Sequence, residues 1–419
     1  MFELVDSVQD KPVIKVIGVG GGGGNAVKHM IASDVEGVDF ICANTDAQAL
    51  KDIEAQTILQ LGNTITRGLG AGANPDIGRQ SALEDRDRIA EVLGGADMVF
   101  ITAGMGGGTG TGGAPIVAEI AKELGILTVA VVTRPFKIEG RKRTVVAEEG
   151  ILELRDKVDS LITIPNDRLL EVLGSKITMK SAYKEADNVL LGAVQGIADL
   201  MIRPGIMNVD FADVRTVMSE MGMAMMGSGS AIGENRAREA AEKAVRSPLL
   251  DNVNLAGARG ILVNIITGSE EAGCQELTLG EYSEVGEIVQ EIASDEATVV
   301  IGTAVDDKLG DEMRVTVVAA GLGEGTPAAR PAKVVDNTRR PEVRESRDVR
   351  ETRDMRESRD MRDMRESHGA AGLVSRESAA DTRPRVDVER PKRPAPSLSS
   401  ADADMEYLDI PAFLRRQAD

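Results

Sequence analysis

Apolar residues in the first part of the chain form short, nearly continuous runs separated by helical patterns. The runs cover residues 13–19, 38–43, 97–103, 126–132 and 161–164. Runs of this length are typical of strands buried on both faces of a sheet. Their alternation with helices predicts βαβ units, a parallel sheet and right-handed crossovers. We therefore expect ligand-binding loops at the C-terminal ends of these strands.

A long helical pattern follows at residues 181–203, in which apolar side chains recur every three or four positions. The stripe is wide, so this helix should be buried on much of its circumference. A smaller α/β region comes next, and we assign its methionines at 218–226 to the core. Its predicted strands are 260–266, 297–302 and 314–319, and its predicted helices are 211–219 and 283–293. The predicted class is α/β: a Rossmann-like parallel-sheet domain joined by a long central helix to a smaller α/β domain.

Globular patterning stops near Gly325. From Val343 a charged hexapeptide repeats as VRESRD, VRETRD and MRESRD, and shortened copies continue to residue 367. With few apolar residues and charge pairs in the less favourable order for a helix, this segment predicts a disordered linker with transient helix. The last residues differ, because apolar side chains cluster again at Tyr407–Leu414. They favour a peptide that docks into a partner's groove over an inert amphipathic end.

Charge is distributed unevenly along the 419 residues. Residues 331–419 hold 19 basic and 19 acidic side chains, which leaves 30 basic and 49 acidic ones in residues 1–330 and places the whole net charge of −19 there. Such a surface argues against nucleic-acid binding, which relies on Lys and Arg. It also predicts that self-association depends on salt and divalent cations, because like-charged subunits repel.

Other residue types narrow the class of protein. The chain has no apolar run of membrane-spanning length and no signal peptide, so we expect no insertion into a membrane. Cys42 and Cys274 are isolated, which predicts two buried, reduced cysteines in a cytoplasmic protein. His29 and His368 are the only histidines, so a zinc site and a Ser–His–Asp triad are both implausible.

Two glycine loops carry the candidate chemistry. GGGTGTG at Gly106–Gly112 lies between the run 97–103 and a helical pattern at 114–121, with Pro115 expected in the first turn of that helix. The unbroken run Gly20–Gly24 lies between the first strand and a helical pattern from Asn25. A strand, a glycine loop and a helix N-terminus form a common phosphate site, to which Thr109 and Thr111 would add hydroxyl donors. Two such loops predict a nucleotide held from both sides, although flexible turns are the alternative.

The residues alone leave the nucleotide open. Gly18, Gly20 and Gly23 match a dinucleotide fingerprint, and Asp46 follows at a suitable distance, so an NAD-dependent oxidoreductase is a rival. Such an enzyme would need a catalytic His or Lys, and histidines are scarce. A Walker A loop is excluded because no Gly-Lys pair occurs. Phosphate charge would then be balanced by backbone N–H groups, helix N-termini and a metal ion.

Both loops, with several further motifs, resemble the tubulin/FtsZ superfamily of GTPases, above all its bacterial cell-division branch. The further motifs are NTD at 44–46, GLGAGANP at 68–75, RPFKIEGRKR at 134–143, IPND at 164–167, NVDFAD at 208–213 and YLDIPAFL at 407–414. The resemblance covers roughly residues 10–320 and the C-terminal end. It implies GTP as substrate and GDP as product, with Mg²⁺.

The resemblance also implies roles for individual residues. Tyr183 and Asp187 share a helix face, where the ring would stack on guanine and the carboxylate would accept its N–H groups; the family more often has phenylalanine at Tyr183. Glu139 would bind the ribose, Arg143 the sugar–phosphate side, and Asn166 would lie beside sugar and base. The loop 68–74 would sense the γ-phosphate. The phosphate contacts implied are Gly21, Gly22, Gly23, Gly24, Asn25, Gly108, Thr109 and Gly110.

Asp210 and Asp213 act in hydrolysis if the resemblance holds. From the residues alone, they also make an ordinary N-cap and first turn for helix 211–219. Asp187 and Arg203 lie sixteen residues apart, or roughly 25 Å along a helix. The two acids therefore cannot reach the γ-phosphate of their own subunit and would act on that of a neighbour. Such a head-to-tail contact gives open filaments or rings.

The implied protein is a GTPase that polymerises into the division ring, in the cytoplasm at mid-cell on the inner face of the membrane. Residues 407–414 would bind tethering and regulatory proteins of the FtsA and ZipA type. The predicted parts are an extension (1–12), a GTP-binding domain (13–180), the central helix (181–203), a C-terminal domain (204–322) with its loop 204–213, a linker (323–402) and a terminal peptide (403–419). The non-enzymatic alternative is a scaffold that binds a nucleotide without turnover. The presence of both Asp210 and Asp213 argues against it.

Overall fold

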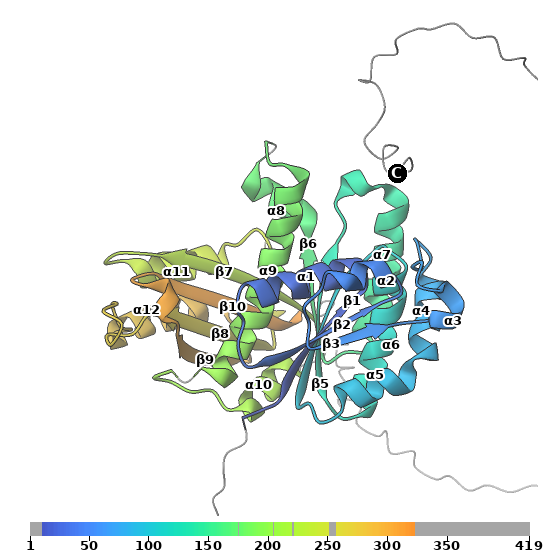
Figure 1. Ribbon diagram of the computed structural model, residues 1–419. Helices are drawn as coiled ribbons and strands as arrows, with labels where there is room; N and C mark the ends of the chain where they lie inside the picture. Colours follow the sequence, from blue (N-terminus) through green and yellow to red (C-terminus); the bar gives the residue numbers. More distant parts are fainter. Residues whose placement is uncertain (1–10, 175, 204, 220–221, 251–256, 323–419) are drawn as a thin grey trace, which may run out of the picture. The chain divides into compact units, whose positions relative to one another are not determined.

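The computed structural model describes residues 11–174, 176–203, 205–219, 222–250 and 257–322 (Figure 1). The predicted linker 323–402, the terminal peptide 403–419 and most of the extension 1–12 lie outside the described residues. Within the described ranges, no helix has the length and apolar character needed to cross a bilayer.

The first half alternates strands and helices. The strands are β1 (Ile14–Val19), β2 (Val38–Asn44), β3 (Thr57–Gln60), β4 (Met98–Gly104), β5 (Leu127–Arg134) and β6 (Ser160–Pro165). The helices are α1 (Gly20–Ala32), α2 (Ala47–Lys51), α3 (Asn63–Thr66), α4 (Pro75–Glu84), α5 (Arg86–Leu93), α6 (Thr109–Glu123), α7 (Arg141–Arg155) and α8 (Asn166–Leu173), with a 3₁₀ turn η1 (Lys137–Glu139).

The second half begins with the long helix α9 (Met179–Ile202), which packs against α1 and against strands of both halves of the sheet (Figure 1). It continues with α10 (Phe211–Met218), β7 (Gly222–Ala231), α11 (Arg236–Val245), β8 (Gly260–Thr267), α12 (Leu279–Ile292), β9 (Thr298–Val305), η3 (Asp307–Leu309) and β10 (Met313–Leu322).

All ten strands of the described part belong to one sheet, in the order β3-β2-β1-β4-β5-β6-β7-β10-β8-β9. Neighbours from β3 to β7 are parallel, as are β8 and β9, and β10 runs antiparallel to both β7 and β8. The two halves meet where β6 pairs with β7 over Ser160–Ile162 and Gly222–Ala224. The predicted α/β class with a parallel sheet is confirmed.

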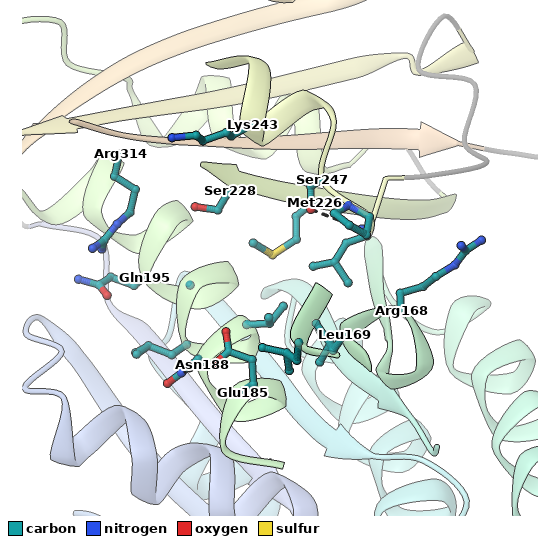
Figure 2. Close-up of a pocket in the computed structure, with 16 residues that line it drawn as sticks. Arg168, Leu169, Glu185, Asn188, Gln195, Met226, Ser228, Lys243, Ser247 and Arg314 are labelled. Carbon is teal, nitrogen blue, oxygen red and sulfur yellow. Dashed lines mark hydrogen bonds between the residues drawn. The ribbon is translucent and has the colours of Figure 1, made fainter. Parts of the chain in front are cut away.

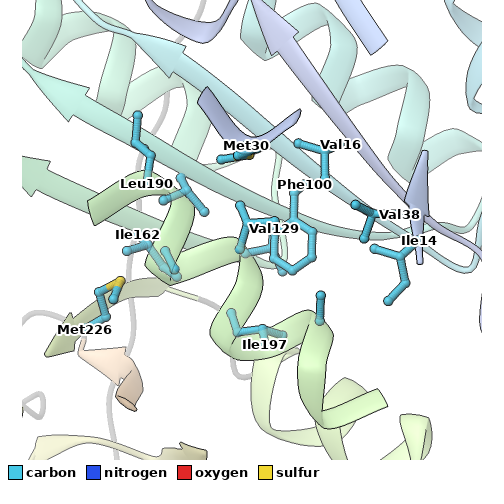
Figure 3. Packing of buried hydrophobic residues seen from close by; sticks show 14 of the residues in the cluster. Ile14, Val16, Met30, Val38, Phe100, Val129, Ile162, Leu190, Ile197 and Met226 are labelled. Carbon is cyan, nitrogen blue, oxygen red and sulfur yellow. The ribbon is translucent and has the colours of Figure 1, made fainter. Parts of the chain in front are cut away.

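Alternate side chains of each strand enter different apolar layers. On β4, Phe100 packs with α1 and α9, whereas its neighbour Ile101 packs under α4–α7. Figure 3 shows the first layer, in which Met30 of α1 and Ile197 of α9 lie close to Phe100. A third layer lies between strands β7–β10 and helices α11 and α12. Because α9 packs on strands of both halves, its two ends are fixed by the same core.

Most elements agree with the apolar periodicity, including the predicted strands and the long helix. Two strands were not predicted, β3 and the Gly- and Met-rich β7. Both helices that follow glycine loops begin earlier than expected, at Gly20 and Thr109. The placement of Pro115 in the first turn of its helix is therefore wrong, because the second half of the glycine loop already winds into α6. Cys42 is buried as expected, but Cys274 is only partly buried.

Candidate functional site

The two glycine loops meet at the C-terminal ends of β1 and β4. A side chain at Gly20 would lie 2.8 Å from the backbone nitrogen of Gly110, and one at Gly22 would lie 2.9 Å from the Cα of Gly104. Neither α1 nor α6 receives a side-chain cap at its N-terminus. Their first N–H groups are therefore free for another acceptor, and the helix dipoles favour an anion there.

A cavity of about 280 Å³ opens beside these loops. Its lining contains six of the residues predicted to bind a nucleotide, together with the predicted stacking residue. These are Gly22, Asn25, Glu139, Arg143, Asn166 and Asp187, with Tyr183. They come from α1, η1, α7, α8 and α9, so residues far apart in the sequence share one wall. Thr133 and Pro135, at the end of β5, also line it and were not singled out from the sequence.

Asp187 supplies the acidic group of this wall. Burial raises its pKa to about 6, and the nearby His29 opposes that rise. The carboxylate is therefore largely ionised at neutral pH and can accept paired N–H donors. His29 also contacts the next residue of α9, with 2.6 Å between its Nε2 and Asn188 Oδ1. This link between α1 and α9 was not predicted, because nothing in the sequence pairs residues so far apart.

Tyr183 and Glu139 are neighbours in the lining of this cavity. The Tyr183 ring packs edge-on against Phe136, with 5.3 Å between centroids and 84° between planes. Burial, followed by the charge of Glu139, raises the pKa of Tyr183. Glu139 Oε1 accepts from Phe136 N at 2.9 Å, and its Oε2 lies 3.2 Å from Arg143 Nη1. These contacts fix an aromatic ring and a carboxylate around the cavity mouth.

Asn166 carries an unsatisfied polar atom. It begins α8 and is 4% exposed, and its Oδ1 has no hydrogen-bond partner in the described part of the chain. A buried acceptor without a donor is costly in a folded protein. Because this residue lines the cavity, a ligand that brings N–H or O–H groups would satisfy it.

The loop 68–74 is tied to the second glycine loop through Thr45. Its backbone has positive φ at Gly68, Gly70 and Gly72. Gly108 N donates to Gly72 O at 2.8 Å, and Ala71 N donates to Thr45 Oγ1 at 3.0 Å. Thr45 Oγ1 in turn lies 2.6 Å from Thr109 Oγ1. Thr45 is fully buried and links the loop 68–74 to Thr109. The sequence did not predict this role.

Several predicted contacts turn inward. Thr111 is buried and its hydroxyl accepts from Gly106 N at 2.8 Å, so it closes the loop; its role as a donor to a ligand stays a prediction. Gly23 and Gly24 lie on the buried side of α1, where a side chain at Gly23 would meet Thr102 O at 2.3 Å. Gly21 is exposed with open space around it. Gly108 and Gly110 are buried in the packing between loops.

The dinucleotide alternative needs Asp46 as a ribose ligand, and the structure gives this residue another role. Its Oδ1 accepts from Gln48 N and Ala49 N and caps α2. The match to the fingerprint therefore lacks its acidic partner.

A larger cavity of about 500 Å³ lies between α8, α9 and strands β7 and β10 (Figure 2). Glu185 and Asn188 face it from α9, and Lys243 and Arg314 face it from the second half of the chain. None of the residues predicted to bind a nucleotide lines it. Size alone would therefore not select the cavity that the predicted residues line.

Asp210 and Asp213 lie beyond the other end of α9. Asp210 is the N-cap of α10, but its side chain makes no capping hydrogen bond, and Asp213 lies in the first turn. Both side chains are exposed, and neither forms a hydrogen bond or ion pair within the described ranges. Helix capping therefore does not explain the Asp210 side chain, because that side chain caps nothing.

Comparisons with known proteins agree with this geometry. Residues 13–174 match the GTPase domain of the Tubulin/FtsZ family, and residues 222–323 match the C-terminal domain of the FtsZ family. The cell division protein FtsZ of Pseudomonas putida is 59% identical over 100% of both chains, and that of Pseudomonas aeruginosa is 58% identical, also over 100% of both. The solved FtsZ dimer of M. jannaschii has a TM-score of 0.71 and 43% identity, covering 75% of this chain and 90% of that one.

Proposed function

The chain belongs to the FtsZ family of tubulin-like GTPases, and from this premise we propose that it assembles head-to-tail and hydrolyses GTP between adjacent subunits. One observation carries the proposal. The cavity at one end of α9 is lined by six of the residues predicted to bind a nucleotide, whereas the side chains of Asp210 and Asp213, past its other end, have no partner among the described residues. A solved relative described as a dimer supports self-association.

The nucleotide would bind along the cavity wall. Guanine offers a ring N–H and an exocyclic amine to the Asp187 carboxylate, and Asn166 Oδ1 can take a further donor from sugar or base. The Tyr183 ring provides a stacking surface, and Glu139 accepts from the ribose. Adenine presents no such pair of donors to an acid, so the geometry favours GTP over ATP.

The triphosphate would lie over the start of α1 and α6. No lysine is present in either loop, so the free N–H groups and dipoles of the two helices hold most of its charge. Among the described residues, no three acidic, His or Cys side chains are placed to hold a metal ion. A bound Mg²⁺ would take its ligands chiefly from phosphate oxygens and water, and would neutralise charge on the phosphates.

Hydrolysis requires the second subunit. Its exposed Asp210 and Asp213 would orient a water in line with the γ-phosphate, and positioning of this kind is the chief contribution that proteins make to phosphoryl transfer. Loss of the γ-phosphate would remove its contacts with the N–H groups of the loop 68–74, whose backbone Thr45 and Gly108 hold beside the second glycine loop. The contact between subunits would then weaken. Assembly would thus complete the hydrolytic site, and hydrolysis at that site would promote disassembly.

We further propose the wider role implied by the family: filaments at mid-cell, on the inner face of the membrane in the cytoplasm. Residues 407–414 would bind tethering proteins of the FtsA and ZipA type. Truncation after residue 402 should leave polymerisation intact and abolish recruitment of such proteins to the polymer. Undiminished recruitment would contradict the role of the peptide.

The central experiment measures sedimented polymer and phosphate release with GTP, with ATP as the control. Turnover per subunit should rise with protein concentration above a threshold, because an isolated subunit lacks half of the site. Asp213→Ala should bind GDP like the wild type and lose at least about 100-fold in turnover, the scale of a lost positioning group. Glu239→Ala, an exposed acid on α11, is the matched control. Turnover independent of concentration would refute the shared site.

A further inference from the structure

The segment that connects α9 to Asp210 is clamped by a single residue of β9. Thr303 N donates to Met207 O at 3.0 Å, and Met207 N donates to Thr303 Oγ1 at 2.8 Å. Thr303 therefore holds both polar backbone groups of Met207, one with its own backbone and one with its side chain. Thr303 is 4% exposed, whereas the Met207 side chain is largely exposed. The clamp lies in the C-terminal half of the sheet, far in sequence from the loop.

Steric contacts on both sides of Met207 leave the segment little freedom. A side chain at Gly205 would lie 1.9 Å from Thr303 O, and one at Gly302 would lie 2.5 Å from Val209 Cγ2. Asn208 also folds back, because its Oδ1 accepts from Gly205 N at 3.0 Å. The segment 205–209 thus fits closely against β9 at Gly302 and Thr303.

The start of the segment is tied to the same strand by charge. Arg203, at the end of α9, places Nε 3.2 Å from Asp199 Oδ1 and Nη1 3.2 Å from Asp306 Oδ1. Asp306 directly follows β9 and is 9% exposed. Because both acids and the guanidinium are mostly shielded from water, this link is less screened than a surface pair. The chain around the segment is therefore attached twice, at Arg203 to the residue that follows β9 and at Met207 to β9 itself.

We propose that Thr303 is a positioning residue for GTP hydrolysis, with β9 as the template that fixes segment 205–209 and so aims Asp210 and Asp213 at the neighbour's nucleotide. This inference rests on the proposed function. The side chains of Ile206, Met207 and Asn208 are exposed, so without the clamp the segment would have to be ordered at each assembly step. An error of about 1 Å at a reacting group can cost a hundredfold in rate.

The test compares Thr303→Val, which removes the hydroxyl but keeps the β-branched shape, with Thr303→Ser, which restores it. Thr303→Val should bind GDP within about twofold of wild type and sediment with GTP, while turnover per polymerised subunit falls about tenfold. Thr303→Ser should recover to within about threefold of wild type. Thr316→Val is the matched control, because Thr316 is a buried strand threonine whose hydroxyl faces Ser228 and not the segment.

The outcomes separate this inference from the proposed function. If wild type neither polymerises nor hydrolyses GTP, the proposed function fails. If wild type is active, Asp213→Ala is inactive and Thr303→Val turns over at the wild-type rate, only the positioning role is refuted. It is also refuted if Thr303→Ser is as slow as Thr303→Val, because the hydroxyl would then not be the group that matters.

Discussion

The two ends of α9 differ in how much of a site each one contains. The cavity end is built within one chain: two glycine loops, Thr45 and the side chains around Asp187 are linked by contacts across the whole first half. The other end presents Asp210 and Asp213 to solvent with no partners in the described residues, on a segment attached mainly to β9. Under the proposed function, a single subunit would suffice for nucleotide binding, whereas hydrolysis would need a second subunit.

The largest effect should come from disturbing the packing at the cavity end. A side chain at Gly112 of α6 would lie 1.9 Å from Pro75 O and 2.7 Å from Arg79 N. Gly112→Ala must therefore push α4 and α6 apart, and we expect a loss of about 3 kcal/mol in the free energy of unfolding, together with loss of nucleotide binding. Thermal unfolding with and without GDP measures both.

Gly192→Ala is the control, because Gly192 lies on α9, outside both glycine loops, and a side chain there would have open space. It should leave stability and binding near those of the wild type. If Gly112→Ala bound GDP normally, the picture of a rigid, prebuilt cavity end would be wrong.

A glycine at the other end should give the contrasting result. Gly205→Ala places a side chain 1.9 Å from Thr303 O. The segment can shift outward into solvent, so we expect GDP affinity to stay within about twofold while turnover falls at least about tenfold. Phosphate release per polymerised subunit, alongside GDP binding, provides the measurement. Gly192→Ala, with open space around it, is the control; equal losses of binding and turnover would remove the distinction between the two ends.

The smallest expected effect is a dependence of GDP affinity on pH, which arises from Asp187 in the cavity. The pKa of Asp187 is raised to about 6 by burial, so its carboxylate is charged above that pH and gains a proton below it. The charged form accepts the guanine N–H groups; GDP affinity should therefore be constant near pH 8 and fall up to about tenfold per pH unit below 6. Titration calorimetry between pH 5 and about 8 measures this dependence.

Asp187→Asn removes the titrating group, so its affinity should be lower and nearly independent of pH. If Asp187→Asn still lost affinity at acid pH, the decline would belong to another group and the assignment to Asp187 would be wrong.

The sign for stability is the reverse of that for binding. A carboxyl whose folded-state pKa lies above its unfolded value of 3.8 destabilises the fold when ionised, so the Asp187 contribution improves as pH falls through 6. Affinity and stability should therefore move in opposite directions across this window. This separation makes it possible to distinguish loss of guanine recognition from unfolding at mildly acid pH.

The sequence by itself determined the elements and the kind of site. Apolar periodicity placed most strands and α9, because burial of alternate or fourth residues is a local pattern. The glycine loops predicted phosphate binding, because only backbone without side chains can pack that closely. Periodicity missed β7, whose glycines are required by a neighbour: side chains at Gly227 and Gly229 would meet Ala244 O at 2.0 Å and Ala240 O at 2.3 Å of α11. A strand in which glycine, alanine and serine interrupt the methionines has no continuous apolar run to reveal it.

Only the tertiary structure decided which residues face the cavity and which turn inward. Thr109 and Thr111 are alike in sequence, yet one contacts Thr45 and the other closes its own loop. The roles of Thr45, Asn166 and Thr303 likewise depend on partners distant in the chain. Hydrogen bonds and steric fit act over a few ångströms in space, and a sequence pattern records only neighbours along the chain. Each end of α9 carries a motif that the sequence shows. Which contacts the residues at each end make is decided by the folded structure.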